Sequence, residues 1–522
     1  MDSTPGLDGT TGAARGVPLR EHRPDSLVHT LLDEAVASSP SAAAVADAEG
    51  RWDYARLDAY SRAFTDWLAE RGVGPGDRLV VQLPTNRELT ALFYGASRRG
   101  AVFVPLNPHM KPYHLRSVLE NAEPALVVCA EGDRATFETV TGAPVHEFGG
   151  VWSEVEKTAD RGPRPEAAVD VAPEDPAVLV YTSGSTAAPK AVVCPHAQMV
   201  FATRSMVQVL GYRPDDVVFC RFPMSWDYGL YKVLMCAAGR SEIVLADGES
   251  DLRLLTAVRE SGATVVPIVP SLAAMIATLA RREEDPAPRV RMFTNTGAAL
   301  PQPVIETLRA AFPGARVVRQ FGQTECKRVS IMPPEEDRER PDSVGRPLPG
   351  TRVLIVDEDG APVPVGETGE IVAVGPHVMP GYWRNPEVTA RTFRRHGPTG
   401  ELRLHTGDYG SLDADGYLYF QGRRDDMFKR KGIRMSTLEI EAAAMDVPGV
   451  RAAAVLPPSD RHDLALFVES DLAPHTVLRE LAGRLEQQKV PAVCRVLAEW
   501  PLTLHGKNEK RRLAELLDGS DQ

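Results

Sequence analysis

Amphipathic helical segments alternate with short apolar segments along most of this chain, and this alternation limits the possible fold more than any other feature. In the first part of the chain, segments with helical periodicity are 26–37, 54–71 and 86–100, and apolar runs are 78–83, 101–106 and 125–129. Short apolar runs between helices are typical of parallel strands covered on both faces. We therefore expect an α/β fold of layered parallel sheets with helices.

The alternation continues after Lys190 and then changes character twice. Residues 353–375 read as hairpin strands bounded by Gly and Pro, which predicts a small β-barrel beside the parallel layers. From about residue 425 a small α+β unit runs to the C-terminus, and residues 1–22 are rich in Gly, Thr, Pro and Ala. We expect a flexible arm at 1–22, a core domain at 23–424 and a C-terminal domain at 425–522.

Composition excludes several classes of protein. A chain of 522 residues with 43% hydrophobic residues can build large packed cores, and its net charge of −12 argues against a general nucleic-acid partner. Its six cysteines are scattered without a CxxC pair, which argues against zinc sites and disulfides and fits a reducing cytoplasm. We find no apolar run of membrane-spanning length and no signal-peptide pattern, so we expect a cytoplasmic protein without a membrane partner.

A stretch of small and hydroxylated residues follows the apolar run at 178–181. It consists of Thr182, Ser183, Gly184, Ser185 and Thr186 and ends near Lys190. Hydroxyls, backbone N–H groups around a Gly turn and one Lys charge suit phosphate oxygens. The stretch is not a Walker loop, because Pro189 and Ala191 replace residues which that motif requires. An ordinary Ser/Thr-rich turn is the alternative interpretation.

Three carboxylates farther along the chain stand in informative surroundings. Asp227 interrupts the aromatic, apolar run 222–230, where a carboxylate needs a partner or a shifted pKa, or else serves as a helix N-cap. Glu325 follows an aromatic-Gly turn and Thr324, an arrangement that can bring a carboxylate to Mg²⁺ and a hydroxyl to phosphate. Asp408 carries a carboxylate that can accept two hydrogen bonds side by side, unless it serves only as a turn residue.

These stretches together resemble the motifs of the adenylate-forming enzymes, which include acyl-CoA ligases, luciferases and peptide-synthetase adenylation domains. The family signature Tyr-Thr-Ser-Gly-(Ser/Thr)-Thr-Gly-x-Pro-Lys-Gly matches residues 181–191, except that Ala187 and Ala191 replace two glycines. Seven blocks occur in the family's order between residues 50 and 512. The resemblance implies a large N-terminal part and a small mobile C-terminal lid that rotates about Asp425.

The resemblance also assigns roles to individual positions. The positions that match the family's ATP site are Thr182, Ser183, Gly184, Ser185, Thr186, Lys190, Gly297, Phe321, Gly322, Thr324, Asp408, Arg423 and Lys507. The positions that match its acyl pocket are Asp227, Tyr228, Tyr231, Thr294, Thr296, Gln320 and Arg328. Lys507, Glu325 and Thr182 would be catalytic, with Glu325 holding Mg²⁺. Arg328 and its neighbour Lys327 could instead be a solvated basic pair.

The resemblance is greatest to free-standing amino-acid adenylating enzymes of bacterial polyketide and macrolactam pathways. It implies ATP-dependent activation of a small α- or β-amino acid, whose ammonium would pair with Asp227. The aminoacyl group would then pass to the phosphopantetheine thiol of a carrier protein that is not part of this chain. The alternatives are an acid–CoA ligase acting on a non-amino acid, and a catalytically inactive scaffold that kept the fold.

Overall fold

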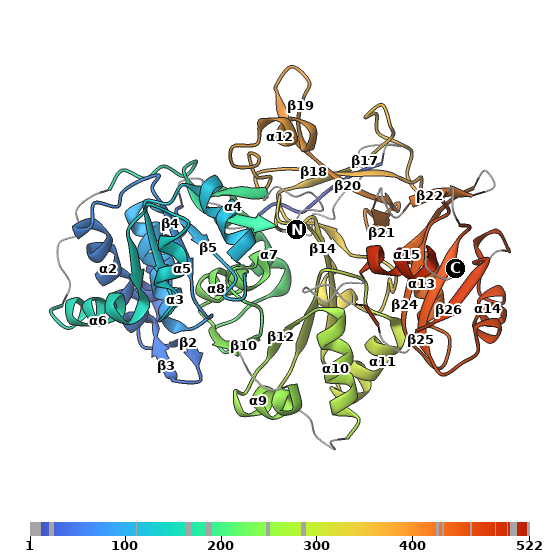
Figure 1. The fold of residues 1–522 in the computed structure, drawn as a ribbon, viewed down its shortest axis with the longest axis horizontal. Helices are drawn as coiled ribbons and strands as arrows, with labels where there is room; N and C mark the ends of the chain where they lie inside the picture. Colours follow the sequence, from blue (N-terminus) through green and yellow to red (C-terminus); the bar gives the residue numbers. More distant parts are fainter. Residues whose placement is uncertain are drawn as a thin grey trace.

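The fold was analysed in a computed structural model of the chain (Figure 1). The structure describes residues 12–19, 26–110, 112–162, 169–182, 190–246, 251–282, 289–423, 427–430, 433–459, 462–485, 487–497, 500–501 and 509–518. It confirms the expected α/β class, with parallel sheets and helices in the larger N-terminal part and a smaller α+β part at the C-terminus (Figure 1).

The first sheet has six strands in the order β7-β6-β4-β5-β8-β9, and all neighbours are parallel except β8 and β9. Its strands are β4 (Arg78–Gln82), β5 (Val102–Pro105), β6 (Leu126–Cys129), β7 (Val145–Glu147), β8 (Pro176–Thr182) and β9 (Lys190–Pro195). The helices in this part are α2 (Tyr54–Glu70), α3 (Arg87–Arg99), α4 (Pro112–Ala122), α5 (Arg134–Glu138) and α6 (Phe148–Ala159). Local sequence sets the ends of α3: the Asn86 side chain accepts from Leu89 N, and Gly100 adopts a left-handed φ of 71°.

The second sheet has nine strands in the order β16-β15-β14-β13-β12-β10-β11-β2-β3. Its strands are β2 (Ala43–Asp47), β3 (Gly50–Asp53), β10 (Val217–Cys220), β11 (Glu242–Leu245), β12 (Val265–Ile268), β13 (Met292–Asn295), β14 (Arg316–Phe321), β15 (Ser330–Ile331) and β16 (Arg346–Pro347). Its helices are α1 (Thr30–Ser38), α7 (His196–Leu210), α8 (Asp227–Gly239), α9 (Leu254–Glu260), α10 (Pro270–Ala280) and α11 (Gln302–Ala311). The strands β14, β13, β12, β10, β11 and β2 are parallel, so their carboxyl ends lie at one edge.

One buried apolar cluster joins the two parallel sheets through the helices between them. It includes Val81 of β4, Phe93 of α3, Met206 of α7, Leu234 of α8 and Phe293 of β13. Because these helices bury apolar residues toward both sheets, the two sheets and their helices form one continuous core.

A third, antiparallel sheet lies at the place of the predicted barrel. Its strands are β1 (Ala13–Arg15), β17 (Arg352–Val356), β18 (Gly369–Val374), β19 (Phe393–His396), β20 (Glu401–Leu412) and β21 (Leu418–Arg423), and α12 (Pro386–Thr392) precedes β19. Strand β1 pairs with β17 although it lies in the predicted flexible arm, and Ala14 is only 1% exposed. This part of the arm is therefore paired and buried.

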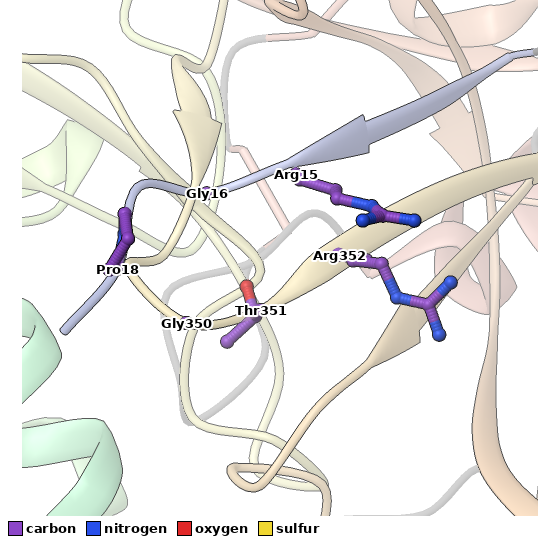
Figure 2. Close-up of a pocket in the computed structure, with 6 residues that line it drawn as sticks. All are labelled: Arg15, Gly16, Pro18, Gly350, Thr351 and Arg352. Carbon is purple, nitrogen blue, oxygen red and sulfur yellow. The ribbon is translucent and has the colours of Figure 1, made fainter. Parts of the chain in front are cut away.

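A shallow cavity of about 570 Å³ runs along this β1–β17 pair. Figure 2 shows its lining, in which Arg15 and Arg352 extend to the same side of the two strands. The Arg352 guanidinium is already bonded to Glu401. The cavity shares no residue with the predicted site.

In its described residues, the C-terminal unit contains two small sheets and three α-helices. Its strands are β22 (Met427–Arg430), β23 (Ile433–Ser436), β24 (Val450–Leu456), β25 (Ala465–Ser470) and β26 (Val493–Val496), and its helices are α13 (Thr437–Met445), α14 (Pro474–Ala482) and α15 (Lys510–Asp518). Its buried residues form apolar clusters of their own, separate from the large core. The unit follows β21 in the sequence and lies at the right of Figure 1. The predicted hinge Asp425 lies outside the described residues.

Candidate active site

The predicted acyl-pocket residues gather at the carboxyl edge of the nine-stranded sheet. Thr294 lies near the end of β13, Gln320 lies near the end of β14, and helix α8 begins with Asp227 and Tyr228. The Tyr228 hydroxyl donates to the Thr294 carbonyl at 2.6 Å, which ties the start of α8 to β13. Ligands of α/β proteins bind at this edge because the connecting loops meet there.

Asp227 has a partner inside the protein. Its Oδ2 atom accepts from Lys327 Nζ at 3.0 Å, and its main-chain carbonyl accepts from the same ammonium at 2.9 Å. Trp226, not Asp227, is the N-cap residue of α8, and no side chain caps this helix. The N-cap interpretation of Asp227 was therefore wrong, whereas the argument that its carboxylate needs a partner was right.

Lys327 and Arg328 are buried, with only 1% and 3% of their surfaces exposed, so the solvated-pair interpretation was also wrong. Lys327 has a left-handed φ of 62°, and a side chain at Gly322 would collide with the Lys327 carbonyl, 2.6 Å away. The chain thus turns back tightly after β14 and directs both cations inward. The sequence analysis did not assign Lys327 to the site, although a carboxylate in the apolar run around Asp227 already called for a cation.

Arg328 is held by uncharged acceptors. Its Nε donates to Gln320 Oε1 at 2.8 Å, and its Nη1 donates to the Lys327 carbonyl at 3.1 Å. Its guanidinium carbon lies 5.3 Å from the centre of the Tyr228 ring. No carboxylate forms an ion pair with Arg328 among the described residues.

Several buried polar atoms near these cations have no hydrogen-bond partner in the described part of the chain. They are the hydroxyls of Ser225 and Tyr231 and the amide nitrogen Nε2 of Gln320. Lys327 Nζ also lies 4.6 Å from the centre of the Tyr231 ring. Buried polar groups are normally paired, so open donors beside buried charges are a feature of a ligand site.

Burial governs the protonation of this cluster. It lowers the pKa of Lys327 to about 8, although the Asp227 carboxylate opposes that shift. It raises the pKa of Tyr228 and Tyr231, so both hydroxyls stay protonated near neutrality. Near pH 7 the cluster of Asp227, Lys327 and Arg328 carries one more positive charge than negative.

Glu325 is joined to a loop from the antiparallel sheet. The Tyr382 hydroxyl donates to Glu325 Oε1 at 2.6 Å, and Met379 N donates to the Glu325 carbonyl at 2.9 Å. Burial, together with the neighbouring carboxylate, raises the pKa of Tyr382 and keeps its hydroxyl a donor. Tyr382 was not among the predicted site residues.

The same loop also binds the strand that leaves the predicted phosphate stretch. Val193 N donates to the Gly381 carbonyl at 3.0 Å, and Trp383 N donates to the Ala191 carbonyl at 2.8 Å. Tyr382 is therefore fixed between β9 and Glu325.

The phosphate stretch itself is described only at its two ends. Thr182 and Lys190 are partners across the antiparallel pair β8–β9, and the Thr182 hydroxyl donates to the Lys190 carbonyl at 3.4 Å. The predicted residues Ser183, Gly184, Ser185, Thr186, Asp425 and Lys507 lie outside the described residues. Their assignments stay predictions.

Four other predicted ATP-site residues, Asp408, Arg423, Phe321 and Gly297, come from other elements. Asp408 of β20 faces Arg423 of β21, with Arg423 Nε 3.3 Å from Asp408 Oδ1. The Phe321 ring lies 5.1 Å from that of Phe420. Gly297 has a φ of 88° in the turn after Thr296, a conformation that favours glycine.

Glu325 fits a magnesium ion that ATP brings with it. The described residues contain no group of three or more His, Cys, Asp or Glu side chains able to hold a metal. Mg²⁺ commonly binds through one or two carboxylates together with substrate phosphates and water. A single, partly exposed carboxylate such as Glu325 suits that arrangement.

Comparison with known proteins decides the family. The family described as "AMP-binding enzyme" matches residues 32–383. The chain belongs to this family. Among known proteins, the chain is similar to a probable non-canonical nonribosomal peptide synthetase, CymA of Salinispora arenicola, with 31% identity over 506 residues. That match covers 92% of this chain but spans only 6% of CymA.

A second curated relative has the same length range as this chain. The L-proline–[L-prolyl-carrier protein] ligase of Pseudomonas fluorescens is 27% identical over 518 residues, with 94% of this chain and all of the relative covered.

Solved structures agree with the family. The crystal structure of VinN is 56% identical, covers 77% of this chain and 100% of VinN, and has a TM-score of 0.73. ATP-bound MatB from Rhodopseudomonas palustris is 27% identical, covers 94% of this chain and 99% of MatB, and has a TM-score of 0.85. These similarities support the adenylate-forming fold with an ATP site and amino-acid activation as the coarse function. No helix in the described ranges is long and apolar enough to cross a membrane.

Proposed function

We propose that this chain adenylates an amino acid with a second carboxylate, using ATP, and transfers the aminoacyl group to the phosphopantetheine thiol of a carrier protein. The observation that carries the substrate class is the excess of buried positive charge beside Asp227. Lys327 neutralises Asp227 at 3.0 Å, and Arg328 is buried without an acidic partner. A buried, unpaired guanidinium is costly unless a ligand anion completes it.

The substrate amine and its second carboxylate suit different members of the cluster. Asp227 Oδ2 accepts one hydrogen bond from Lys327, and a carboxylate can accept several, so it has capacity for a substrate ammonium. Arg328, the open Gln320 Nε2 and Lys327 are donors suited to a carboxylate.

Known relatives support the same substrate class. VinN structures similar to this chain have been solved in complex with L-aspartate, at 55% identity and a TM-score of 0.71, and with 3-methylaspartate, at 52% and 0.67. The L-proline–[L-prolyl-carrier protein] ligase supports a carrier protein as the acceptor. The similarity to CymA supports a role in nonribosomal-peptide-like assembly. A macrolactam or polyketide pathway rests on the motif resemblance alone.

The chemistry requires charge neutralisation and positioning rather than covalent catalysis. A carboxylate oxygen of the substrate attacks the α-phosphorus of ATP, the bond to pyrophosphate breaks, and an acyl-adenylate forms. The carrier thiol then attacks the acyl carbon and AMP leaves. Thr182, Lys190 and Lys507 would stabilise the phosphate charge, and Mg²⁺ held by Glu325 would add to it.

Pyrophosphate exchange with a matched set of acids tests this proposal. We expect exchange with L-aspartate or 3-methylaspartate, and much less with β-alanine, asparagine and succinate. Thioester formation is then compared between a holo-carrier protein and free coenzyme A. Preference for succinate and coenzyme A would instead support the acid–CoA ligase, and absence of exchange with every acid would support an inactive scaffold.

A further inference from the structure

A second buried lysine lies just behind the candidate pocket. Lys232 stands one helical turn after Tyr228 on α8, and only 2% of its surface is exposed. Its Nζ donates weakly to the Tyr212 hydroxyl at 3.5 Å and lies 3.9 Å from the sulfur of Met235. None of the described carboxylates forms an ion pair with it.

Such a lysine is unfavourable for the folded protein. An ammonium buried without a counter-charge loses its hydration and gains little from a long hydrogen bond and a thioether. A methionine or leucine would fill the same space without that cost. A strongly perturbed ionisable group at such a position is a feature of functional sites.

The surroundings of Lys232 connect it to the pocket. Its Nζ lies 4.8 Å from the centre of the Tyr228 ring, and the same ring has Lys327 Nζ at 5.4 Å and the Arg328 guanidinium carbon at 5.3 Å. Three buried cations therefore surround one tyrosine, and Asp227 is paired with only one of them, Lys327. Burial is the main cause that lowers the pKa of Lys232, and the charges of Arg328 and Lys327 lower it further.

We propose that Lys232 is a positioning residue whose ammonium, placed behind Tyr228, strengthens the binding of the second substrate carboxylate at Arg328. This inference rests on the proposed function, because it needs a substrate with two carboxylates. Lys232 does not touch the substrate. It adds positive potential in a region of low dielectric, where a charge acts over several ångströms.

The titratable groups around Lys232 make this effect depend on pH. They are Tyr212 on the connection before β10, Cys220 at the end of β10, Tyr228 and Cys236 on α8, and Lys327 and Arg328 after β14. Burial and the two neighbouring cations lower the pKa of Lys232 to about 7. Affinity for the second carboxylate therefore falls as the pH rises above 7, because Lys232 loses its proton.

Binding to wild type and two variants tests the inference, with L-aspartate as probe and β-alanine as the probe that lacks the second carboxylate. We expect Lys232→Met to weaken L-aspartate binding about tenfold, the size of one charge–charge interaction in a partly polar interior. Binding of β-alanine should change little. Lys232→Arg should keep the affinity near pH 7 and should shift the start of its decline to higher pH. Exposed Lys157→Met is the control for a simple change of net charge.

Thermal unfolding distinguishes this role from a structural one. If Lys232 serves binding at the expense of stability, Lys232→Met raises the unfolding midpoint while it weakens L-aspartate binding. A lower midpoint with unchanged L-aspartate affinity would overturn the inference, as would an equal loss for both probes. Wild type alone tests the proposed function: failure to bind L-aspartate better than β-alanine refutes that function and this inference together.

Discussion

Lys327 Nζ lies 3.0 Å from Asp227 Oδ2, so a buried ammonium from the loop after β14 pairs with the partly exposed carboxylate of the first residue of α8. This pair changes how the pocket discriminates its substrate. Asp227 does not depend on the substrate ammonium for neutralisation, so an amine adds a second cation to a carboxylate that already has one. Selection for amines then depends on the hydrogen bonds that Asp227 can still accept. It also depends on the negative charge of the substrate carboxylates, which offsets the positive charge of the pocket.

Replacement of Asp227 by Asn should affect substrates with and without an amine differently. We expect pyrophosphate exchange with L-aspartate to fall about 100-fold, because a charge-assisted hydrogen bond to the ammonium becomes a neutral one. Exchange with succinate, although poor in wild type, should fall far less. If both substrates lost activity in the same proportion, Asp227 would serve only the structure.

The same variant should also lose stability, because Lys327 would stay buried without its counter-charge. We expect a loss of up to roughly 3–5 kcal/mol, the range for removing one partner of a buried ion pair, because the Lys327 side chain left behind is only 1% exposed. The double variant Asp227→Asn/Lys327→Met removes both charges and should recover most of that loss, but not the preference for amines. Chemical denaturation of the single and double variants measures this coupling.

Tyr382→Phe should weaken the use of magnesium by the enzyme. The variant keeps the ring but loses the 2.6 Å hydrogen bond to Glu325 Oε1, which orients the proposed metal ligand. Loss of a residue that orients a metal ligand typically costs about 10–100-fold in metal affinity. The Mg²⁺ concentration for half-maximal exchange should rise, and Mn²⁺ binding with ATP, followed by electron paramagnetic resonance, should weaken in parallel. Tyr419→Phe, which also removes one hydroxyl–carboxylate contact, is the matched control.

The parallel layers and their helices were predictable because apolar periodicity is a local property of the sequence. The pairing of β1 with β17 was not, because residues 13–15 are too short a stretch for a pattern and join a strand more than 300 residues away. The fold brings Tyr228 to Thr294, as the motif order indicated. Lys327 and Tyr382 were missed because a tight turn at Gly322 and a contact between distant loops bring them to the site.

Acid should destabilise the protein through buried histidines. Burial lowers the pKa of His377 to about 3, and neither ring nitrogen has a hydrogen-bond partner among the described residues. As the pH falls, His377 becomes protonated near pH 6.5 in the unfolded chain, but only near pH 3 in the folded protein. Stability is therefore lost as the pH falls from about 6.5 toward 3, by about 2 kcal/mol for this one residue at pH 5. The His377→Leu variant should show a smaller fall in unfolding free energy between pH 7 and pH 5; an unchanged fall would assign the effect to other groups.

Lys507→Ala should separate the two half-reactions. From the resemblance to the family, we expect adenylation to lose about 100-fold or more, the scale of one preorganised charge contact to the transition state. Thioester formation from a supplied acyl-adenylate should stay largely intact, because the proposed lid rotation would have removed Lys507 from the site by then. Single-turnover measurements of each step test this, and an equal loss in both would contradict a lid with two positions.

Arg328→Met should remove the preference for a second carboxylate. Arg328 is buried, has only neutral hydrogen-bond partners at Gln320 and the Lys327 carbonyl, and is thus available to a ligand anion. We expect the KM for L-aspartate to rise about 100-fold, because a buried charge-assisted contact is lost, whereas the KM for β-alanine should change much less.

Because the variant also leaves Gln320 without its partner, the ratio of the two KM values is the informative quantity. Arg328→Lys keeps the charge without the planar fork and should restore part of the preference. Arg281→Met, at an exposed position, is the control for the loss of one arginine charge. A constant KM ratio across these variants would place the second carboxylate away from Arg328.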